Sequence, residues 1–146
     1  MASASTIDRD LAERLRARGQ RVTSQRLVIN RVLHARDQHV TAEEVLGAVS
    51  ETLPGTSLPT VYATLELLEQ LGLVRRVRAG AGPVLFDSRA GEHHHLHCRR
   101  CGALEDLDAP LDVAPALAAA HRAGYTSARA ALVVDGLCDA CSASAN

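Results

Sequence analysis

Two Cys-x-x-Cys turns contain all four cysteines of the chain and constrain its fold more than any other feature. The turns are Cys98-Arg99-Arg100-Cys101 and Cys138-Asp139-Ala140-Cys141. Together they offer four sulfurs at the spacing that a tetrahedral zinc site needs. Two disulfides are the alternative, but close pairs in a chain whose first residues do not resemble a signal peptide favour a metal. The sequence therefore predicts a structural zinc ion held by all four cysteines.

A histidine cluster lies directly before the first turn, where residues 92–97 read Glu-His-His-His-Leu-His. These imidazoles cannot all bind an ion that four cysteines already saturate, so we expect a second metal site of a different kind. If this segment is a strand, His93, His95 and His97 share one face and Cys98 points to the other. A metal bound on the histidine face then leaves the cysteine site undisturbed.

Composition and charge narrow the class of protein. The 146 residues suffice for one large domain or two small ones, and no stretch approaches the roughly 20 apolar residues of a membrane helix. We therefore expect a cytoplasmic protein without membrane contact. The net charge is −1, yet the segment from Arg14 to Arg36 holds seven arginines and no acidic residue. Such a local basic face indicates a nucleic-acid partner.

The first half of the chain reads as a winged helix. Helices are expected over residues 7–18, after a cap at Thr23, after a Thr41 capping box, and from Ser57 to about Leu71. Residues 73–78 and 84–86 then form a β-hairpin around the glycine-rich residues 79–83. Three to four short helices followed by a hairpin are typical of a winged-helix DNA-binding domain, which we place at residues 1–86.

The second half reads as a small mixed unit after a hinge at residues 87–91. Strands are expected over residues 93–98, 103–107 and 128–135, with a helix over residues 111–123 and a frayed tail from residue 142. The predicted fold class is therefore α+β. A winged-helix domain is followed by a small α/β dimerisation domain, residues 92–146, that carries the four-cysteine zinc site.

In a winged helix, the helix that begins near Ser57 lies in the major groove of DNA. Two groups of candidate contacts follow. The helix presents Ser57, Thr60, Tyr62, Ala63 and Thr64 toward bases or phosphates. The DNA phosphate backbone is contacted by Arg21, Thr23, Gln25 and Arg26. Tyr62 contacts a thymine methyl or a phosphate, unless it is an ordinary core aromatic. One module reads half a site, so we expect a homodimer on double-stranded operator DNA.

Several motifs, in this order along the chain, resemble the ferric uptake regulator (Fur) family of metal-dependent repressors. They are Arg-Val-Thr-Ser-Gln-Arg at residues 21–26, Thr-Val-Tyr-Ala-Thr-Leu-Glu-Leu-Leu at 60–68, His-His-His-Leu-His-Cys-Arg-Arg-Cys-Gly at 93–102, and the second CxxC turn. The resemblance implies a winged helix, a dimerisation domain, a structural zinc and a regulatory metal at the hinge that closes the dimer onto DNA.

Carried over residue by residue, the resemblance implies five regulatory ligands: His39, Asp87, His93, His95 and Asp106. This nitrogen and oxygen set suits Fe²⁺ or Mn²⁺, although Zn²⁺ can occupy it in a purified sample. Zinc sensors of the family tend to have a cysteine where this chain has Asp87. The set is most similar to the peroxide-responsive branch, in which bound iron and hydrogen peroxide oxidise a ligand histidine, here His39 or His93. Plain iron- or zinc-responsive regulation remains the alternative.

The chain departs from the family pattern at several positions. Ala63 stands where the family often has Arg, which leaves the set of base contacts open. Val113 and Ala130 are apolar where some members bind a further metal, so we expect that site to be absent and His94 to bind no metal. His97 is either a supplementary ligand or simply exposed.

Two readings of other classes compete with the repressor. A zinc-dependent hydrolase would use the histidine cluster for catalysis, but no HExxH pattern or nucleophile elbow is present and the basic helical half would be unexplained. A zinc-ribbon interaction module without DNA contact is the other alternative. We therefore expect a regulator rather than an enzyme.

Overall fold

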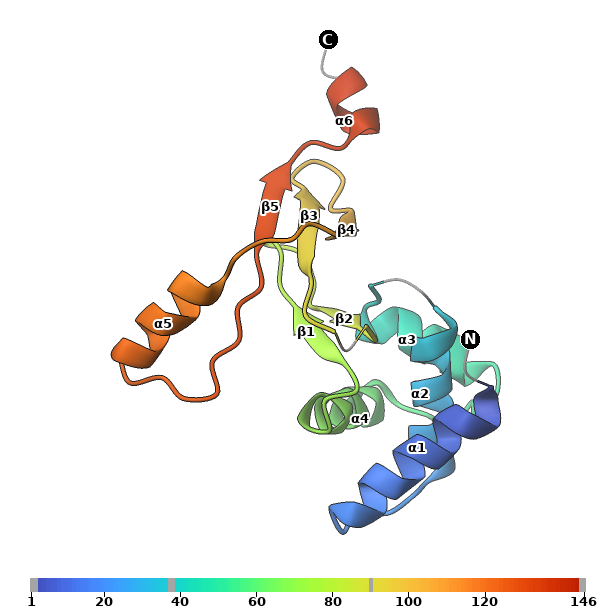
Figure 1. Ribbon diagram of the computed structural model, residues 1–146. Helices are drawn as coiled ribbons and strands as arrows, with labels where there is room; N and C mark the ends of the chain where they lie inside the picture. Colours follow the sequence, from blue (N-terminus) through green and yellow to red (C-terminus); the bar gives the residue numbers. More distant parts are fainter. Residues whose placement is uncertain (1–2, 37–38, 90, 145–146) are drawn as a thin grey trace. The chain divides into compact units, whose positions relative to one another are not determined.

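The computed structural model describes residues 3–36, 39–89 and 91–144 (Figure 1). The chain divides into two compact units. The first comprises Met1–Arg78 and Pro83–Ala90, and the second comprises Ala79–Gly82 and Gly91–Asn146. Within the described ranges, no helix combines the length and apolar character of a membrane span.

Four helices build the first unit: α1 (Ala4–Ala17), α2 (Ser24–Ala35), α3 (Ala42–Ser50) and α4 (Leu58–Gln70). The predicted caps of the last three helices are confirmed. The hydroxyls of Thr23 and Ser57 accept the third backbone N–H of their helices, and Thr41 and Glu44 form the complete capping box. The first helix begins three residues earlier than expected because Ser3 caps it by accepting from the Thr6 N–H.

The helices of the first unit bury aliphatic stripes around one aromatic residue. Leu11, Leu15, Ile29, Val45, Val61, Leu65 and Phe86 are each at most 1% exposed. Phe86 comes from the hairpin, so the wing and the helices share one hydrophobic core.

The predicted hairpin is confirmed, but its strands are short: β1 (Arg75–Val77) and β2 (Leu85–Asp87) pair antiparallel. Asp87 closes β2 opposite Arg75, so it belongs to the strand rather than to the connection that follows. Val40 forms an additional antiparallel bridge with Phe86 on the other edge of β2. This bridge adds Val40 to the edge of the small sheet.

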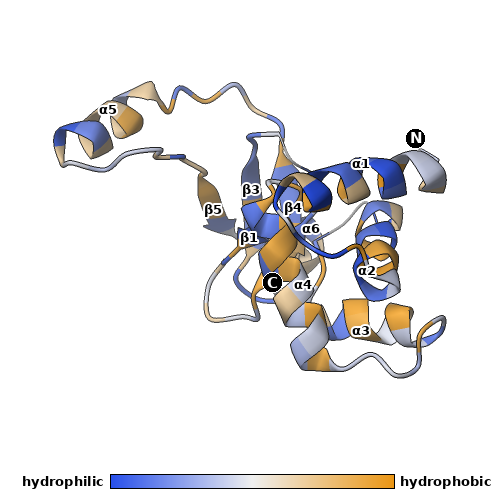
Figure 2. Cartoon of the chain, turned by 90° about the horizontal axis from the view of Figure 1, so that it is seen from below, coloured by the Kyte–Doolittle hydropathy of each residue, from blue (hydrophilic) through white to orange (hydrophobic). Residues whose placement is uncertain are grey.

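The second unit is a three-stranded sheet of order β4-β3-β5 with two helices. Its elements are β3 (His94–Cys98), β4 (Leu104–Leu107), α5 (Ala114–Arg122), β5 (Val133–Gly136) and α6 (Asp139–Ala143). β5 is half as long as predicted and is parallel to β3. α6 covers part of the segment read as a frayed tail. The predicted α+β class is confirmed. Apolar residues occur along both α5 and β5 (Figure 2).

Candidate metal centres and nucleic-acid interface

The two CxxC turns of the second unit come together as the spacing predicts. The sulfur atoms of Cys98, Cys101, Cys138 and Cys141 all lie within 4.8 Å of one another. None is in a disulfide, and the Cys101 and Cys138 sulfurs are 3.8 Å apart. Zinc–sulfur bonds of about 2.3 Å in a tetrahedron separate two sulfurs by about 3.8 Å. The cluster therefore fits a structural zinc ion.

Local structure prepares the first cysteine for metal binding. Backbone N–H groups of Cys101, Cys138 and Arg100 hydrogen-bond to the Cys98 sulfur and lower the pKa of its thiol to about 5. A hydrogen bond with the Cys138 sulfur raises the pKa of Cys141 to about 12, since adjacent sulfurs resist a second negative charge. The positive charge of a divalent cation offsets this repulsion between sulfurs. All four ligands can then be thiolates when the metal is bound.

Arg100 fastens the two turns to each other, which the sequence did not indicate. Its Nη1 donates a hydrogen bond of 2.9 Å to the Cys141 carbonyl, across 41 positions of the chain. The guanidinium also adds a positive charge beside a cluster that carries net negative charge once it binds zinc.

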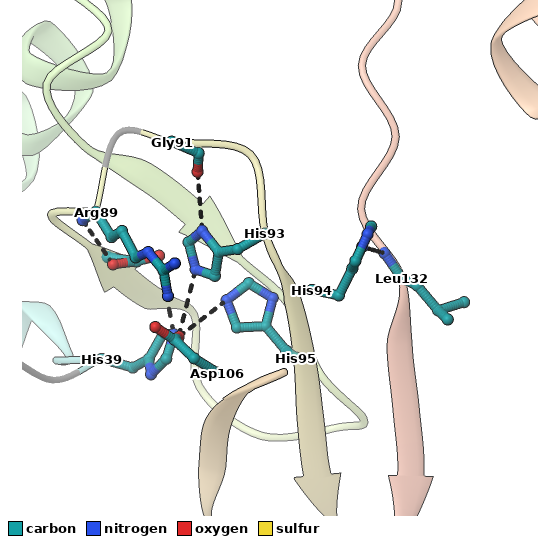
Figure 3. A network of polar contacts seen from close by, with 9 residues as sticks. His39, Arg89, Gly91, His93, His94, His95, Asp106 and Leu132 are labelled. Atoms are coloured by element: carbon teal, nitrogen blue, oxygen red, sulfur yellow. Dashed lines mark hydrogen bonds and ion pairs between the residues drawn. The ribbon is translucent and has the colours of Figure 1, made fainter. Parts of the chain in front are cut away.

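Two histidines and one carboxylate of the second unit form a separate group (Figure 3). His95 is paired with Asp106 across β3 and β4, and its Nε2 lies 4.0 Å from the Asp106 carboxylate. The His93 Nε2 is 3.3 Å from the same carboxylate, while its Nδ1 hydrogen-bonds to the Gly91 carbonyl at 2.8 Å. That second contact fixes the orientation of the ring, as is usual for metal-binding histidines.

The other two predicted ligands lie together in the first unit. Because Val40 pairs with Phe86, His39 stands directly opposite Asp87, and the two side chains approach to 3.9 Å. The Asp87 carboxylate also accepts the Arg89 backbone N–H at 2.8 Å. Both side chains are largely buried, with 9% of His39 and 8% of Asp87 exposed.

The two remaining histidines of the cluster have structural partners. His94 Nδ1 accepts the Leu132 N–H at 3.1 Å (Figure 3), which anchors the chain just before β5. His97 Nδ1 hydrogen-bonds to the Asp135 carboxylate at 2.6 Å. A Cβ added at Gly80, whose φ is +59°, would lie 2.9 Å from the His97 ring. His97 is therefore packed and partnered, which neither expectation for it anticipated.

Most of the predicted DNA contacts lie around one hollow in the first unit. Its lining includes seven of the nine candidates: Arg21, Thr23, Gln25, Arg26, Thr60, Ala63 and Thr64. Of the other two candidates, Ser57 caps α4. Tyr62 is 44% exposed, so the alternative that it is a core aromatic is wrong. Thr64 is only 4% exposed. It nevertheless lines the hollow, so its contact with DNA stays a prediction.

Some arginines of the basic segment are already paired within the first unit. Arg31 forms an ion pair with Asp8 and lowers the pKa of that carboxyl, while Arg14 pairs with Asp10 at 3.0 Å. The Arg26 guanidinium donates to the Arg21 carbonyl at 2.5 Å, which holds it beside the hollow. The arginines that line the hollow, Arg21 and Arg26, are thus the better candidates for phosphate contacts.

Comparisons with known proteins agree on one family. A sequence model described as the ferric uptake regulator family matches residues 17–134. The transcriptional regulator FurA of Mycobacterium tuberculosis is 37% identical over 136 residues, which is 92% of either chain. The peroxide-responsive repressor PerR of Staphylococcus epidermidis is 32% identical and covers 99% of either chain. The ferric uptake regulator structure from Helicobacter pylori has the same fold, with a TM-score of 0.79, 19% identity, and coverage of 97% of this chain and 95% of that one.

The pKa values of the cysteines predict how zinc binding depends on pH. Cys98 stays a thiolate down to a pH of about 5, whereas Cys141 must lose a proton to bind the ion. Protons therefore compete with zinc, and the affinity rises with pH. We expect zinc to be retained near neutral pH and released below a pH of about 5. A chromophoric chelator in stepwise acidification measures the release.

Cys138→Ser is the matched variant, because it removes one sulfur and one of the hydrogen-bonded neighbours of Cys141. This variant should lose zinc at a higher pH than the unchanged protein. Its second unit should unfold when the zinc is lost, while its first unit stays folded. Equal zinc retention by the two proteins at every pH would contradict a four-sulfur site.

Proposed function

Because the chain belongs to the ferric uptake regulator family, we propose that it is a repressor that binds operator DNA when its regulatory metal is bound. Membership makes the chain a metal-dependent transcription regulator rather than an enzyme, so the hydrolase reading is wrong. Action on DNA within the cell also supports a cytoplasmic location.

The group formed by His93, His95 and Asp106 carries the proposal of a regulatory metal. Two imidazoles and one carboxylate that leave coordination positions open are typical of non-haem Fe²⁺ sites. The three side chains approach one another closely and contain no sulfur. Their chemistry therefore differs from that of the cysteine cluster, which supports a second, exchangeable ion of Fe²⁺ or Mn²⁺ beside the structural Zn²⁺.

We propose that His39 and Asp87 complete the coordination of this ion. The two side chains stand opposite each other in the first unit, and they match the family pattern in which the DNA-binding domain supplies ligands. An ion that binds donors of both units favours one relative orientation of those units over others. Metal binding would thus select the orientation in which two copies of the first unit fit the operator.

The DNA interface of the proposed repressor is the hollow between the start of α2 and the start of α4. Arg21 and Arg26 supply positive charge for phosphates, and Thr23, Gln25, Ser57 and Thr60 supply hydrogen-bonding groups at helix N-termini. Tyr62 and Ala63 lie on the exposed face of α4 and would face base edges. Counterion release at the arginines makes the affinity fall as salt rises.

A homodimer is the assembly that the second unit supports. Leu96, Leu111, Leu132, Val134 and Leu137 are each at least 39% exposed. Leu96 and Val134 are neighbours on one face of the sheet, opposite the face of His95. Clustered exposed apolar residues of this kind mark interaction surfaces. We propose a second copy of the chain as the partner, because its DNA-binding unit would bind the second half-site of the operator.

Hydrogen peroxide is the signal that we propose for release from DNA. The support is the carboxylate pair Asp87 and Asp106 together with imidazole ligands, and the similarity to a peroxide-responsive repressor. A ferrous ion held there would supply one-electron chemistry toward peroxide, by which one oxygen atom would add to a ligand histidine and the other would leave as water. His39 and His93 are the candidates for that oxidation, and loss of either weakens the link between the units. Release on loss of iron alone is the alternative within the same family.

The dimer surface is tested by charge. Leu96→Glu places a carboxylate on the apolar face of β3, so we expect it to shift the protein toward monomer in sedimentation equilibrium at constant zinc content. Thr52→Glu, which adds the same charge at an exposed position of the first unit, is the matched control and should leave the dimer intact. A dimer unaffected by Leu96→Glu would place the interface elsewhere.

Metal-dependent repression is tested by DNA affinity with and without Mn²⁺, on duplexes selected from a random library. His93→Ala and His95→Ala should each lose the gain in affinity that metal gives, about tenfold to 100-fold for couplings of this kind. His121→Ala, at an exposed position of α5, is the control and should keep the full gain. Metal-independent binding by the unchanged protein would contradict the proposed function.

The signal is tested by loading the protein with Fe²⁺ or with Mn²⁺ without oxygen and adding substoichiometric peroxide. Peptide mass spectrometry should find the mass of one added oxygen atom on the peptide containing His39 or His93, in the Fe²⁺ sample alone. DNA binding should fall in the same sample. Intact histidines with retained DNA binding would assign the protein to plain metal sensing.

A further inference from the structure

Tyr62 and Glu43 form a polar contact between two helices of the first unit. Tyr62 lies on the exposed face of α4, and its hydroxyl donates a hydrogen bond of 3.3 Å to a Glu43 carboxylate oxygen. Glu43 belongs to the first turn of α3, where the helix dipole favours a negative charge. The carboxylate and the phenol oxygen are therefore adjacent at the end of a side chain proposed to face DNA.

The neighbouring glutamate has a different role. The Glu44 carboxylate accepts the Thr41 backbone N–H at 2.7 Å and the Thr41 hydroxyl at 3.0 Å, so it closes the capping box. Glu43 is not part of that box, and its carboxylate turns to Tyr62 instead. Helix stability thus accounts for Glu44, whereas Glu43 acts on the side chain of α4.

Donation to Glu43 decides what the tyrosine oxygen offers to DNA. A phenol carries one proton and two lone pairs, and a carboxylate carries lone pairs only. Once the proton points to Glu43, the pair presents hydrogen-bond acceptors and a negative charge. Phosphate oxygens have the same character, so the pair repels them and is unsuited to the backbone contact considered for Tyr62.

Base edges in the major groove include both donors and acceptors. Adenine N6 and cytosine N4 carry donor amino groups, whereas guanine O6 and thymine O4 are acceptors. We propose that Glu43 is a specificity-determining residue, which holds the Tyr62 hydroxyl as an acceptor and so favours adenine or cytosine at the operator base that faces it. The inference rests on the proposed function, in which α4 reads the major groove.

The test measures the affinity of the metal-loaded full chain for four duplexes that differ in the base pair facing Tyr62. That position is first found by selection from a random library, as the one that Tyr62→Phe no longer discriminates. The unchanged protein should prefer adenine or cytosine there by about threefold to tenfold, the worth of one hydrogen bond. Glu43→Gln should reverse the order toward guanine or thymine, because a neutral amide donates to the phenol oxygen and frees the phenol proton.

Two further proteins separate specificity from charge. Glu66→Gln removes one negative charge from an exposed position of α4 and should raise affinity for all four duplexes equally, without changing their order. The double variant Glu43→Gln with Tyr62→Phe should behave as Tyr62→Phe alone, since Glu43 acts through the hydroxyl. Equal melting temperatures of the variants and the unchanged protein establish that each is folded.

The outcomes distinguish the two proposals. A protein that selects no sequence from the library, with or without metal, overturns the proposed function itself. Sequence-selective binding in which Glu43→Gln changes all four affinities by the same factor, as Glu66→Gln does, overturns only the role of Glu43. If Tyr62→Phe discriminates every selected position as strongly as the unchanged protein does, the role of Glu43 is overturned equally, because no base then depends on the hydroxyl.

Discussion

The alternation of side chains along β3 is the constraint on which both metal centres depend. His95 points to the face that carries Asp106, whereas Cys98, three residues later, points to the opposite face and joins the sulfur cluster. One short strand thereby separates nitrogen and oxygen donors from thiolates. A register shift of one residue would turn His94 and Leu96 toward Asp106 and move Cys98 away from its partners. Two ions of different chemistry require this one pairing.

Local signals in the sequence predicted the first unit and the cysteine cluster well. The caps at Thr23, Thr41 and Ser57 depend on residues three positions apart, so they are readable without tertiary information. The four cysteines are similarly explicit, because paired sulfurs at this spacing suit few structures other than a metal site. The resemblance to a known family supplied the other donors that we propose, which no local rule contains.

Long-range pairings could not be predicted in the same way. The bridge between Val40 and Phe86, which sets His39 opposite Asp87, joins two segments that have no shared pattern. The contact of Arg100 with Cys141 spans the whole second unit. Asp135 meets His97 only because β5 is parallel to β3 in a particular register. The sequence predicts a strand over residues 128–135, because the apolar residues 130–132 resemble part of a strand. In the structure those residues precede β5, which begins at Val133.

The close approach of Gly80 to His97 links two positions that are distant in the chain. A side chain at position 80 would meet the imidazole at 2.9 Å, and its backbone is already left-handed at φ +59°. Asp135 holds the ring in place at 2.6 Å, so the ring cannot turn aside without losing that bond. Sequence drift at these positions is therefore coupled. Replacing the histidine removes the steric clash at position 80, but the left-handed backbone there still favours glycine.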